Sequence, residues 1–341
     1  MASQVNPEVG VRPLLLRPRH PIASLTLAFA LWKALLLVAV TACPGPGYDT
    51  STSLLPYLGG TDTSTGAGVG AASRLSSLLK FVRWDSIYFA HVVEHGYVFE
   101  QEWAFGYGYL RFLGFLTSCM VDPEYYGRNS ANCELVFNTA QVGKVLQFAW
   151  VGVALSHLAH YLSVLALYRL SINVFGHQTP TQRLICFLSA VLHIISPAGA
   201  FLSAPYGEPL FSFLNTSGLY LYSSSFLDDG AGKKFTREPK LLGAAVLFAV
   251  ATTLRSNGIL SGFLFAYDAV WQLRRVLCHG LSWDAVVRLG VVVVGGCVVA
   301  LGFVLPQVVA YTTYCLPDST ARPWCQWAIP SIYGWVQGQY W

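Results

Sequence analysis

The stretch at residues 289–311, LGVVVVGGCVVALGFVLPQVVAY, decides the fold class of this chain. It carries no charged side chain, and a helix of about 20 apolar residues is long enough to cross the hydrocarbon core of a bilayer. The rest of the 341-residue chain has the same character, because 54% of the residues are hydrophobic and only 11% are charged, and the mean hydropathy is +0.49. These features predict one polytopic membrane domain over residues 1–341, an all-α helical bundle rather than a set of soluble domains.

Six other apolar runs have the length and hydropathy of membrane spans. Two of them are short arms that meet at Arg255-Ser256-Asn257-Gly258. The first run follows a basic stretch, and because it is longer than the apolar core of a signal peptide, we expect it to remain in the protein as an anchor. The predicted spans are residues 22–42, 145–170, 184–204, 209–226, 241–254, 259–273 and 289–311.

The basic residues predict the orientation of these spans. If residues 1–21 are cytosolic, the short loops obey the positive-inside rule, and the long segments 43–144 and 312–341 lie on the non-cytosolic side. Topology then explains the net charge of +4. Because the basic residues form no patch interleaved with aromatics, we predict no nucleic-acid partner. The predicted cytosolic basic residues are Arg12, Arg17, Arg19, Arg169, Arg183, Lys233, Lys234, Arg237, Lys240, Arg274, Arg275 and Arg288.

Asp85 is a carboxylate at the predicted membrane surface. It lies in Arg83-Trp84-Asp85-Ser86, after the first span and on the same side as Glu208 and Arg255. A charge in so apolar a chain needs a compensating reason, and we interpret Asp85 as a group that performs chemistry, with helix capping as the alternative. Residues 75–93 predict one amphipathic helix in the interface, anchored by its aromatic residues, with Asp85 facing the aqueous boundary.

Glu208 and Arg255 are two further charges beside apolar runs. Glu208 follows a span that ends in helix breakers, and it is either a favourable charge at the start of the next helix or a substrate ligand. Arg255 could hold a lipid-linked phosphate through two parallel hydrogen bonds. Its alternative role is an internal ion pair, for which Glu208 is the candidate partner.

The segment at residues 94–105, EHGYVFEQEWAF, combines carboxylates, an imidazole and aromatic rings. Sugar hydroxyls need directional donors and acceptors, and the apolar face of a hexose packs on Trp or Tyr, so the segment fits a carbohydrate site. The same residues also suit any loop at the interface.

Two other functional classes remain open at this stage. His91, Glu94 and His95 match the His-x-x-Glu-His pattern of inverted zinc proteases, although no downstream acidic ligand stands out. A polytopic transporter could bind a solute at the break at residues 255–258, but the halves show no internal repeat.

The cysteines on the non-cytosolic side, in an oxidising lumen, could form disulfides. They are Cys43, Cys119, Cys133, Cys315 and Cys325, and we prefer the pair Cys315 and Cys325. The sequence has one Asn-x-Ser/Thr sequon, at Asn215, and we expect it to stay unmodified because it lies inside a predicted span.

Several motifs in chain order carry a resemblance to a known family. They are Arg83-Trp84-Asp85, Glu94-His95-Gly96-Tyr97, Ser196-Pro197-Ala198 with Glu208, Arg255-Ser256-Asn257-Gly258, Pro323-Trp324-Cys325, Pro330-Ser331-Ile332-Tyr333 and Gln337-Gly338-Gln339-Tyr340-Trp341. In combination they resemble the PIG-V type of GPI mannosyltransferase, which adds the second mannose in GPI-anchor assembly.

The resemblance implies a GT-C glycosyltransferase, multi-pass in the endoplasmic reticulum membrane. It would move mannose from dolichyl phosphate mannose, in α-1,6 linkage, to the first mannose of a GPI precursor glycolipid. The implied partners are membrane lipid, that glycolipid and a small accessory membrane subunit, and no metal or other cofactor is established. The implied catalytic residue is Asp85, and the implied substrate-binding residues are Arg83, Trp84, His95, Tyr97, Glu100, Glu102, Glu208, Arg255 and Asn257.

The chain departs from the family pattern in two places. Ala104-Phe105-Gly106-Tyr107-Gly108 stands where many relatives have a run with proline, and its glycines resemble fungal members. Similar proteins continue beyond Trp341 with further luminal sequence and spans, so we expect this chain to be C-terminally truncated.

Overall fold

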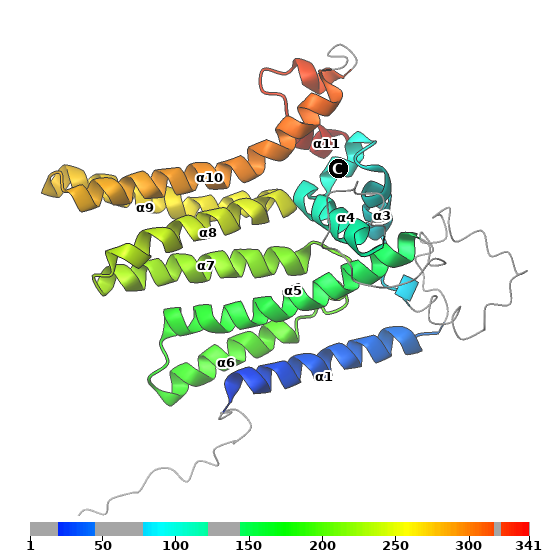
Figure 1. The fold of residues 1–341 in the computed structure, drawn as a ribbon, viewed down its shortest axis with the longest axis horizontal. Helices are drawn as coiled ribbons and strands as arrows, with labels where there is room; N and C mark the ends of the chain where they lie inside the picture. Colours follow the sequence, from blue (N-terminus) through cyan, green and yellow to red (C-terminus); the bar gives the residue numbers. More distant parts are fainter. Residues whose placement is uncertain (1–19, 45–77, 122–143, 317–321, 341) are drawn as a thin grey trace, which may run out of the picture.

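The computed structural model of the protein describes residues 20–44, 78–121, 144–316 and 322–340, and every regular element in these ranges is a helix (Figure 1). Most of the long helices lie side by side in one layered bundle. The α-helices are α1 (Pro21–Ala42), α3 (Ser86–His95), α4 (Tyr107–Val121), α5 (Lys144–Phe175), α6 (Pro180–Ile194), α7 (Glu208–Gly230), α8 (Lys234–Leu254), α9 (Gly262–His279), α10 (Trp283–Tyr314) and α11 (Ile332–Tyr340); the 3-10 helices are η3 (Glu100–Ala104), η4 (Ser256–Ser261) and η5 (Pro323–Gln326).

Each of the seven predicted spans corresponds to a helix of this bundle. By length and hydropathy, three helices in the described part could cross a membrane: α1, residues Leu146–Phe175 of α5, and α10. The two predicted short arms are α8 and α9, and they meet at Arg255 and η4 as expected. The prediction of an all-α polytopic membrane protein is therefore confirmed.

The predicted span at residues 184–204 is wrong in its second half, because α6 ends at Ile194. Pro197 has no amide hydrogen to continue the helix, and turns follow up to α7. Side chains of neighbouring helices bind two carbonyl groups of this irregular segment: Lys33 Nζ donates to the Leu202 oxygen at 2.8 Å, and Ser156 Oγ donates to the Ala204 oxygen at 2.6 Å. Such compensation lets irregular backbone persist at membrane depth.

The predicted interfacial helix at residues 75–93 is also wrong as one continuous element. Within the part of it that is described, α3 begins only at Ser86, and Trp84 has a left-handed backbone with φ of 50°. A bulky residue cannot hold that conformation inside a right-handed helix. The break removes Trp84 from the helix and places Asp85 at its N-terminal end.

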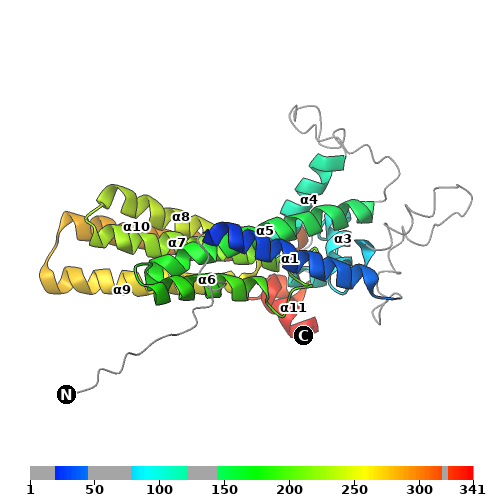
Figure 2. The ribbon, with the colours of Figure 1, turned by 90° about the horizontal axis from the view of Figure 1, so that it is seen from below.

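The two ends of the bundle differ in character. Both views place α3, α4 and α11 at one end (Figures 1 and 2). The connections between α5 and α6, α7 and α8, and α9 and α10 lie at the other end, and the described basic residues that the sequence assigns to the cytosol lie in these connections or in the adjoining turns of the helices. Asp85, Glu208 and Arg255 thus share one end, as predicted, while Arg12, Arg17 and Arg19 lie outside the described residues.

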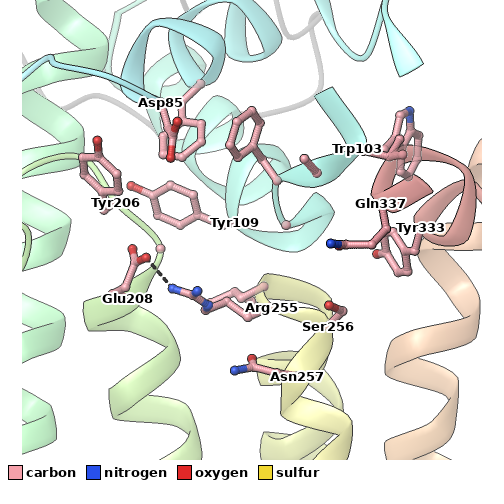
Figure 3. A pocket seen from close by; sticks show the side chains of 17 residues that line it. Asp85, Trp103, Tyr109, Tyr206, Glu208, Arg255, Ser256, Asn257, Tyr333 and Gln337 are labelled. Atoms are coloured by element: carbon pink, nitrogen blue, oxygen red, sulfur yellow. Dashed lines mark hydrogen bonds and ion pairs between the residues drawn. The ribbon is translucent and has the colours of Figure 1, made fainter. Parts of the chain in front are cut away.

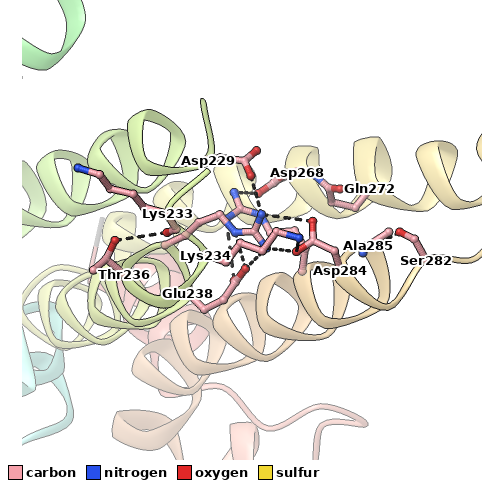
Figure 4. A network of polar contacts seen from close by, with 12 residues as sticks. Asp229, Lys233, Lys234, Thr236, Glu238, Asp268, Gln272, Ser282, Asp284 and Ala285 are labelled. Carbon is pink, nitrogen blue, oxygen red and sulfur yellow. Dashed lines mark hydrogen bonds and ion pairs between the residues drawn. The ribbon is translucent and has the colours of Figure 1, made fainter. Parts of the chain in front are cut away.

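Buried charges join four helices at the basic end (Figure 4). The Arg237 guanidinium on α8 is 4% exposed and binds Asp229 on α7 at 2.5 Å, Asp284 on α10 at 3.0 Å, and Glu238. Nearby, Arg288 of α10 binds Asp268 of α9 at 3.0 Å. Buried charges are tolerated when they are paired in this way.

The predicted disulfide is confirmed: Cys315 and Cys325 are bonded, with their Cα atoms 5.6 Å apart. It ties the end of α10 to η5. Of the other cysteines predicted on this side, Cys133 lies outside the described residues.

Candidate active site

A cavity of about 470 Å³ opens at the end of the bundle that holds α3, α4 and α11 (Figure 3). Its walls come from α3, η3, α4, the start of α7, the junction of α8 with η4, and α11. The polar and aromatic side chains that line it include Asp85, Trp103, Tyr109, Tyr206, Glu208, Arg255, Ser256, Asn257, Tyr333 and Gln337.

Asp85 occupies the N-cap position of α3 and faces this cavity. Its side chain makes no capping hydrogen bond in the described structure, so capping does not use the carboxylate. The strained backbone of Trp84 precedes it, and the Tyr206 hydroxyl donates to the Arg83 carbonyl at 2.9 Å. Strain of this kind persists only where the surroundings impose it, and it is frequent at active sites.

Partial burial and the nearby Glu208 carboxylate raise the pKa of Asp85 above its ordinary value of 3.8. Burial is the larger cause, because removal from water penalises the charged form. The negative charge of Glu208 adds repulsion. A carboxylate with a raised pKa is a better proton acceptor than an ordinary aspartate.

Glu208 and Arg255 face each other as an ion pair across the cavity floor. Glu208 is the first residue of α7 and Arg255 follows the last residue of α8, so each charge suits the dipole of its helix. The ion pair weighed as the alternative role of Arg255 is therefore present, and its predicted role as a phosphate ligand stays a prediction. The two side chains remain 39% and 43% exposed, which leaves both groups open to a ligand.

Two glycines let the start of α4 approach the end of α8. A Cβ on Gly106 would lie 1.6 Å from the Leu254 carbonyl oxygen, and one on Gly108 would lie 2.1 Å from Thr253 Oγ1. Only glycine allows backbones to pack this closely. The contact places Phe105 and Tyr109 in the same cavity wall as Arg255, so the glycine form of this segment has a structural purpose at the site.

The Tyr109 hydroxyl has no hydrogen-bond partner within the described structure, although the residue is only 2% exposed. It points into the space near Asp85 and Glu208 (Figure 3). Burial and Glu208 raise the pKa of Tyr109, so the hydroxyl keeps its proton and can donate it in a hydrogen bond. A buried hydroxyl left without a partner is costly, which suggests that a ligand completes it.

The structure brings four of the predicted site residues together at the cavity: Asp85, Glu208, Arg255 and Asn257. Arg83 and Trp84 flank Asp85 without lining the cavity, and the Trp84 ring packs on Phe201 with centroids 5.6 Å apart. The other four predicted ligands make contacts within the protein.

Those four are His95, Tyr97, Glu100 and Glu102. Glu102 is 1% exposed and accepts hydrogen bonds from the amides of Val98 and Phe99 at 2.8 and 2.9 Å. The Tyr97 hydroxyl donates to the Phe105 carbonyl at 3.3 Å. Glu100 accepts hydrogen bonds from Trp324 and Trp335. None of the four lines the cavity.

The histidines of the His-x-x-Glu-His motif also make contacts within the protein. His91 Nδ1 lies 2.6 Å from Glu102 Oε1, and the rings of His91 and His95 stack with centroids 4.7 Å apart. Across the described ranges, no group of three or more His, Cys, Asp or Glu side chains is arranged to hold a metal ion.

Sequence reasoning missed Trp103, Tyr109, Tyr206, Tyr333 and Gln337 as lining residues. Trp103 lies in the quoted segment at residues 94–105 and Tyr206 lies just before Glu208, but nothing local distinguishes them from other aromatic residues. Tyr333 and Gln337 belong to the C-terminal motifs, which reach the site only through the fold.

Comparison with known proteins decides the family. The model described as Mannosyltransferase (PIG-V) matches residues 26–341. The chain belongs to the PIG-V mannosyltransferase family. That family assignment places the chain among glycosyltransferases, in place of the protease and transporter alternatives.

PIG-V family relatives cover nearly all of this chain. It is 57% identical to GPI mannosyltransferase 2 of Aspergillus oryzae over 97% of this chain and 68% of the relative. For GPI mannosyltransferase 2 of Aspergillus fumigatus the values are 51%, 96% and 63%. For GPI alpha-1,6-mannosyltransferase 2 of mouse they are 31%, 76% and 50%. The chain thus spans about two thirds of the length of the fungal relatives. No solved structure matches it significantly.

Proposed function

We propose that this protein transfers mannose from dolichyl phosphate mannose, in α-1,6 linkage, to the first mannose of a GPI-anchor precursor at the endoplasmic reticulum membrane. The observation that carries the proposal is the cavity in which Asp85 faces the ion pair of Glu208 and Arg255. Family membership and the name of the mouse relative support the reaction class and the linkage.

In this mechanism Asp85 is the general base. The acceptor hydroxyl oxygen attacks the anomeric carbon of the donor mannose, and its proton passes to the Asp85 carboxylate. The bond between that carbon and the phosphate oxygen breaks with its electron pair moving to the phosphate, and the configuration at the carbon inverts. A base placed in this way contributes roughly 10² to 10⁴ in rate.

Arg255 stabilises the charge that the departing phosphate retains. It is the one cationic side chain among the described residues that line the cavity. Because dolichyl phosphate leaves as a stable anion, no general acid is needed, unlike in glycosidases that use two carboxylates. A guanidinium suits a phosphate through two parallel hydrogen bonds, and Glu208 orients it.

The Tyr109 hydroxyl completes the site as a hydrogen-bond donor. Its position near Asp85 and Glu208 lets it reach an oxygen of the sugar or the phosphate. Asn257 and Ser256 add neutral donors and acceptors beside Arg255. The proposed partners are membrane lipid, the GPI precursor glycolipid and a small accessory membrane subunit, as the family resemblance implies.

Asp85→Asn tests the proposal, because an amide cannot accept the proton. We expect mannose transfer in microsomes from cells that lack their own enzyme to fall by at least roughly 10²-fold. Membrane insertion and protein level should stay unchanged. Glu94→Gln is the matched control, since Glu94 lies on the same helix but does not line the cavity. Near-normal transfer by Asp85→Asn would refute the assignment of the base.

A further inference from the structure

We propose that helix α11 forms the acceptor-sugar wall of the cavity and that Glu100 is the positioning residue that holds it there. This inference rests on the proposed function, because it divides that cavity between the two substrates. The acceptor class is a glycan with exposed hydroxyls, bound through ring stacking and amide hydrogen bonds.

The Glu100 side chain connects η3 to the C-terminal segment through hydrogen bonds and an ion pair. Trp324 Nε1 donates to one carboxylate oxygen at 2.7 Å, and Trp335 Nε1 of α11 donates to the other at 2.8 Å. Arg322 Nη1 lies 2.6 Å from the first oxygen. With both oxygens occupied and its side chain 13% exposed, Glu100 is satisfied by the protein itself.

The electrostatics of Glu100 fit this role. Burial acts to raise its pKa, but the hydrogen bonds from Trp324, Arg322 and Trp335 outweigh burial and hold the pKa below its ordinary value of 4.5. The carboxylate is therefore ionised at neutral pH. Charge-assisted hydrogen bonds are stronger than neutral ones, so the contact is suited to fixing a short helix.

A second set of contacts fixes the same segment. The Cys315–Cys325 disulfide joins α10 to η5, and Ser331 Oγ donates to Gln307 Oε1 of α10 at 2.5 Å. The Arg322 guanidinium lies over the Tyr314 ring at 4.4 Å. These contacts seat α11 so that Tyr333, Val336 and Gln337 line the cavity.

The two ends of the cavity differ in chemistry (Figure 3). Asp85, Glu208 and Arg255 gather at one end with Tyr109 and Tyr206, while Trp103, Tyr333 and Gln337 gather at the other. A lipid-linked phosphate needs the cation, so the donor belongs with Arg255. The uncharged end offers the partly exposed Tyr333 ring and the exposed Gln337 amide, which suit a sugar ring and its hydroxyls. Trp103 itself is 2% exposed, and its ring packs against Tyr97 and Tyr107.

The acceptor glycan would therefore lie along α11 and direct its terminal sugar toward Asp85. Burial raises the pKa of Tyr333 to about 12, so its hydroxyl stays protonated at neutral pH. Gln337 extends from α11 into the same space. Their contacts would set acceptor affinity without touching the donor.

The first test measures the KM for each substrate with the full chain in microsomes. Gln337→Ala should raise the KM for the glycolipid acceptor by roughly 2- to 10-fold, the value of one hydrogen bond, and leave the KM for dolichyl phosphate mannose unchanged. Gln339→Ala is the matched control on the same helix, because it is exposed and does not line the cavity. An unchanged acceptor KM, or a raised donor KM, would overturn the proposal.

The second test separates positioning from general stability. Glu100→Gln should raise the acceptor KM, and the Glu100→Gln/Gln337→Ala double variant should be little worse than Glu100→Gln, because both changes act through one wall. Equal losses for donor and acceptor, together with a lower melting temperature, would show a merely structural role for Glu100.

The third test does not depend on turnover. A photoreactive analogue of the acceptor glycolipid should label α11, as mapped by mass spectrometry, and unlabelled acceptor should compete with it. If the analogue labels α11 but the protein transfers no mannose, the proposed reaction is rejected and the acceptor wall is retained. If the protein transfers mannose but α11 is not labelled, the acceptor wall is rejected and the proposed reaction is retained.

Discussion

Asp85 is held in a state that opposes its own ionisation. Its pKa is raised, so the folded protein binds the proton more tightly than the unfolded chain does, and folding becomes less favourable as the pH rises from 3.8 through the raised value. Trp84 beside it has a strained backbone. Both features disfavour the folded state at neutral pH, as is typical of residues kept for chemistry.

Glu208→Gln tests this electrostatic coupling. Removing the negative charge should lower the pKa of Asp85, because repulsion from Glu208 is one of the two causes that raise it. A base must be deprotonated to act, so the acid limb of the kcat/KM profile should move to lower pH. The profile of the Glu94→Gln control should not move. An acid limb that stays in place or moves to higher pH would contradict the coupling.

At this scale the sequence reveals charged groups better than neutral ones. Asp85, Glu208 and Arg255 could be predicted because a charge in an apolar chain needs a reason. Glu100 and Glu102 drew attention because their segment combines carboxylates with aromatic rings, but that pattern does not show whether a carboxylate faces a ligand or indole and amide donors. Tyr109 could not be predicted, because its significance lies in a missing partner.

At the scale of elements, the site depends on the contact between the start of α4 and the end of α8. Hydropathy predicts the long helices because their environment is mostly uniform. It does not predict α4, which packs against α3, α5 and α8, or α11, which packs against η3 and α10. Nor does it predict the break before α3, which depends on one backbone angle. Helix α6 ends early, at Ile194, because helix-breaking residues follow it. Side chains on other helices donate hydrogen bonds to carbonyl groups of that segment, and the sequence does not show these contacts.

Gly106→Ala tests the contact between α4 and α8. The added methyl group would meet the Leu254 carbonyl oxygen at 1.6 Å, so α4 must shift away from Arg255. We expect a loss of about 1–3 kcal/mol in stability, seen as a lower melting temperature in detergent, and reduced transfer. Gly114→Ala is the matched control, because its Cβ would meet its nearest neighbour at 3.8 Å, an ordinary contact. Equal behaviour of the two variants would argue against close packing at Gly106.

At the scale of the whole molecule, the bundle separates a basic end from the end with the cavity. The positive-inside rule predicts the basic end to be cytosolic, and the cavity then opens to the lumen. Counting the predicted spans along the chain, each of which reverses its direction across the membrane, was enough to predict that Asp85, Glu208 and Arg255 lie at one end. The count of spans could not predict how the helices pack, and therefore could not predict that α11 packs against η3.

Accessibility labelling in sealed microsomes tests this orientation. The test uses Val98→Cys and Leu281→Cys. Val98 lies near the cavity and is 48% exposed, whereas Leu281 lies in the loop between α9 and α10 and is 82% exposed. With the other unpaired cysteines replaced, a membrane-impermeant maleimide should modify the cysteine at 281 and reach that at 98 only after detergent is added. The reverse pattern would place Asp85 on the cytosolic face and defeat the proposed mechanism.

The Arg237 cluster bears on how the protein is made. Its guanidinium is carried by α8, but Asp284, one of its counter-ions, belongs to α10 and is synthesised later. Until α10 emerges from the ribosome, the arginine must rely on Asp229 and Glu238 alone, and Asp268 of α9 likewise waits for Arg288 of α10. We therefore expect these four helices to insert together, because the order of translation delays full charge neutralisation until α10 arrives.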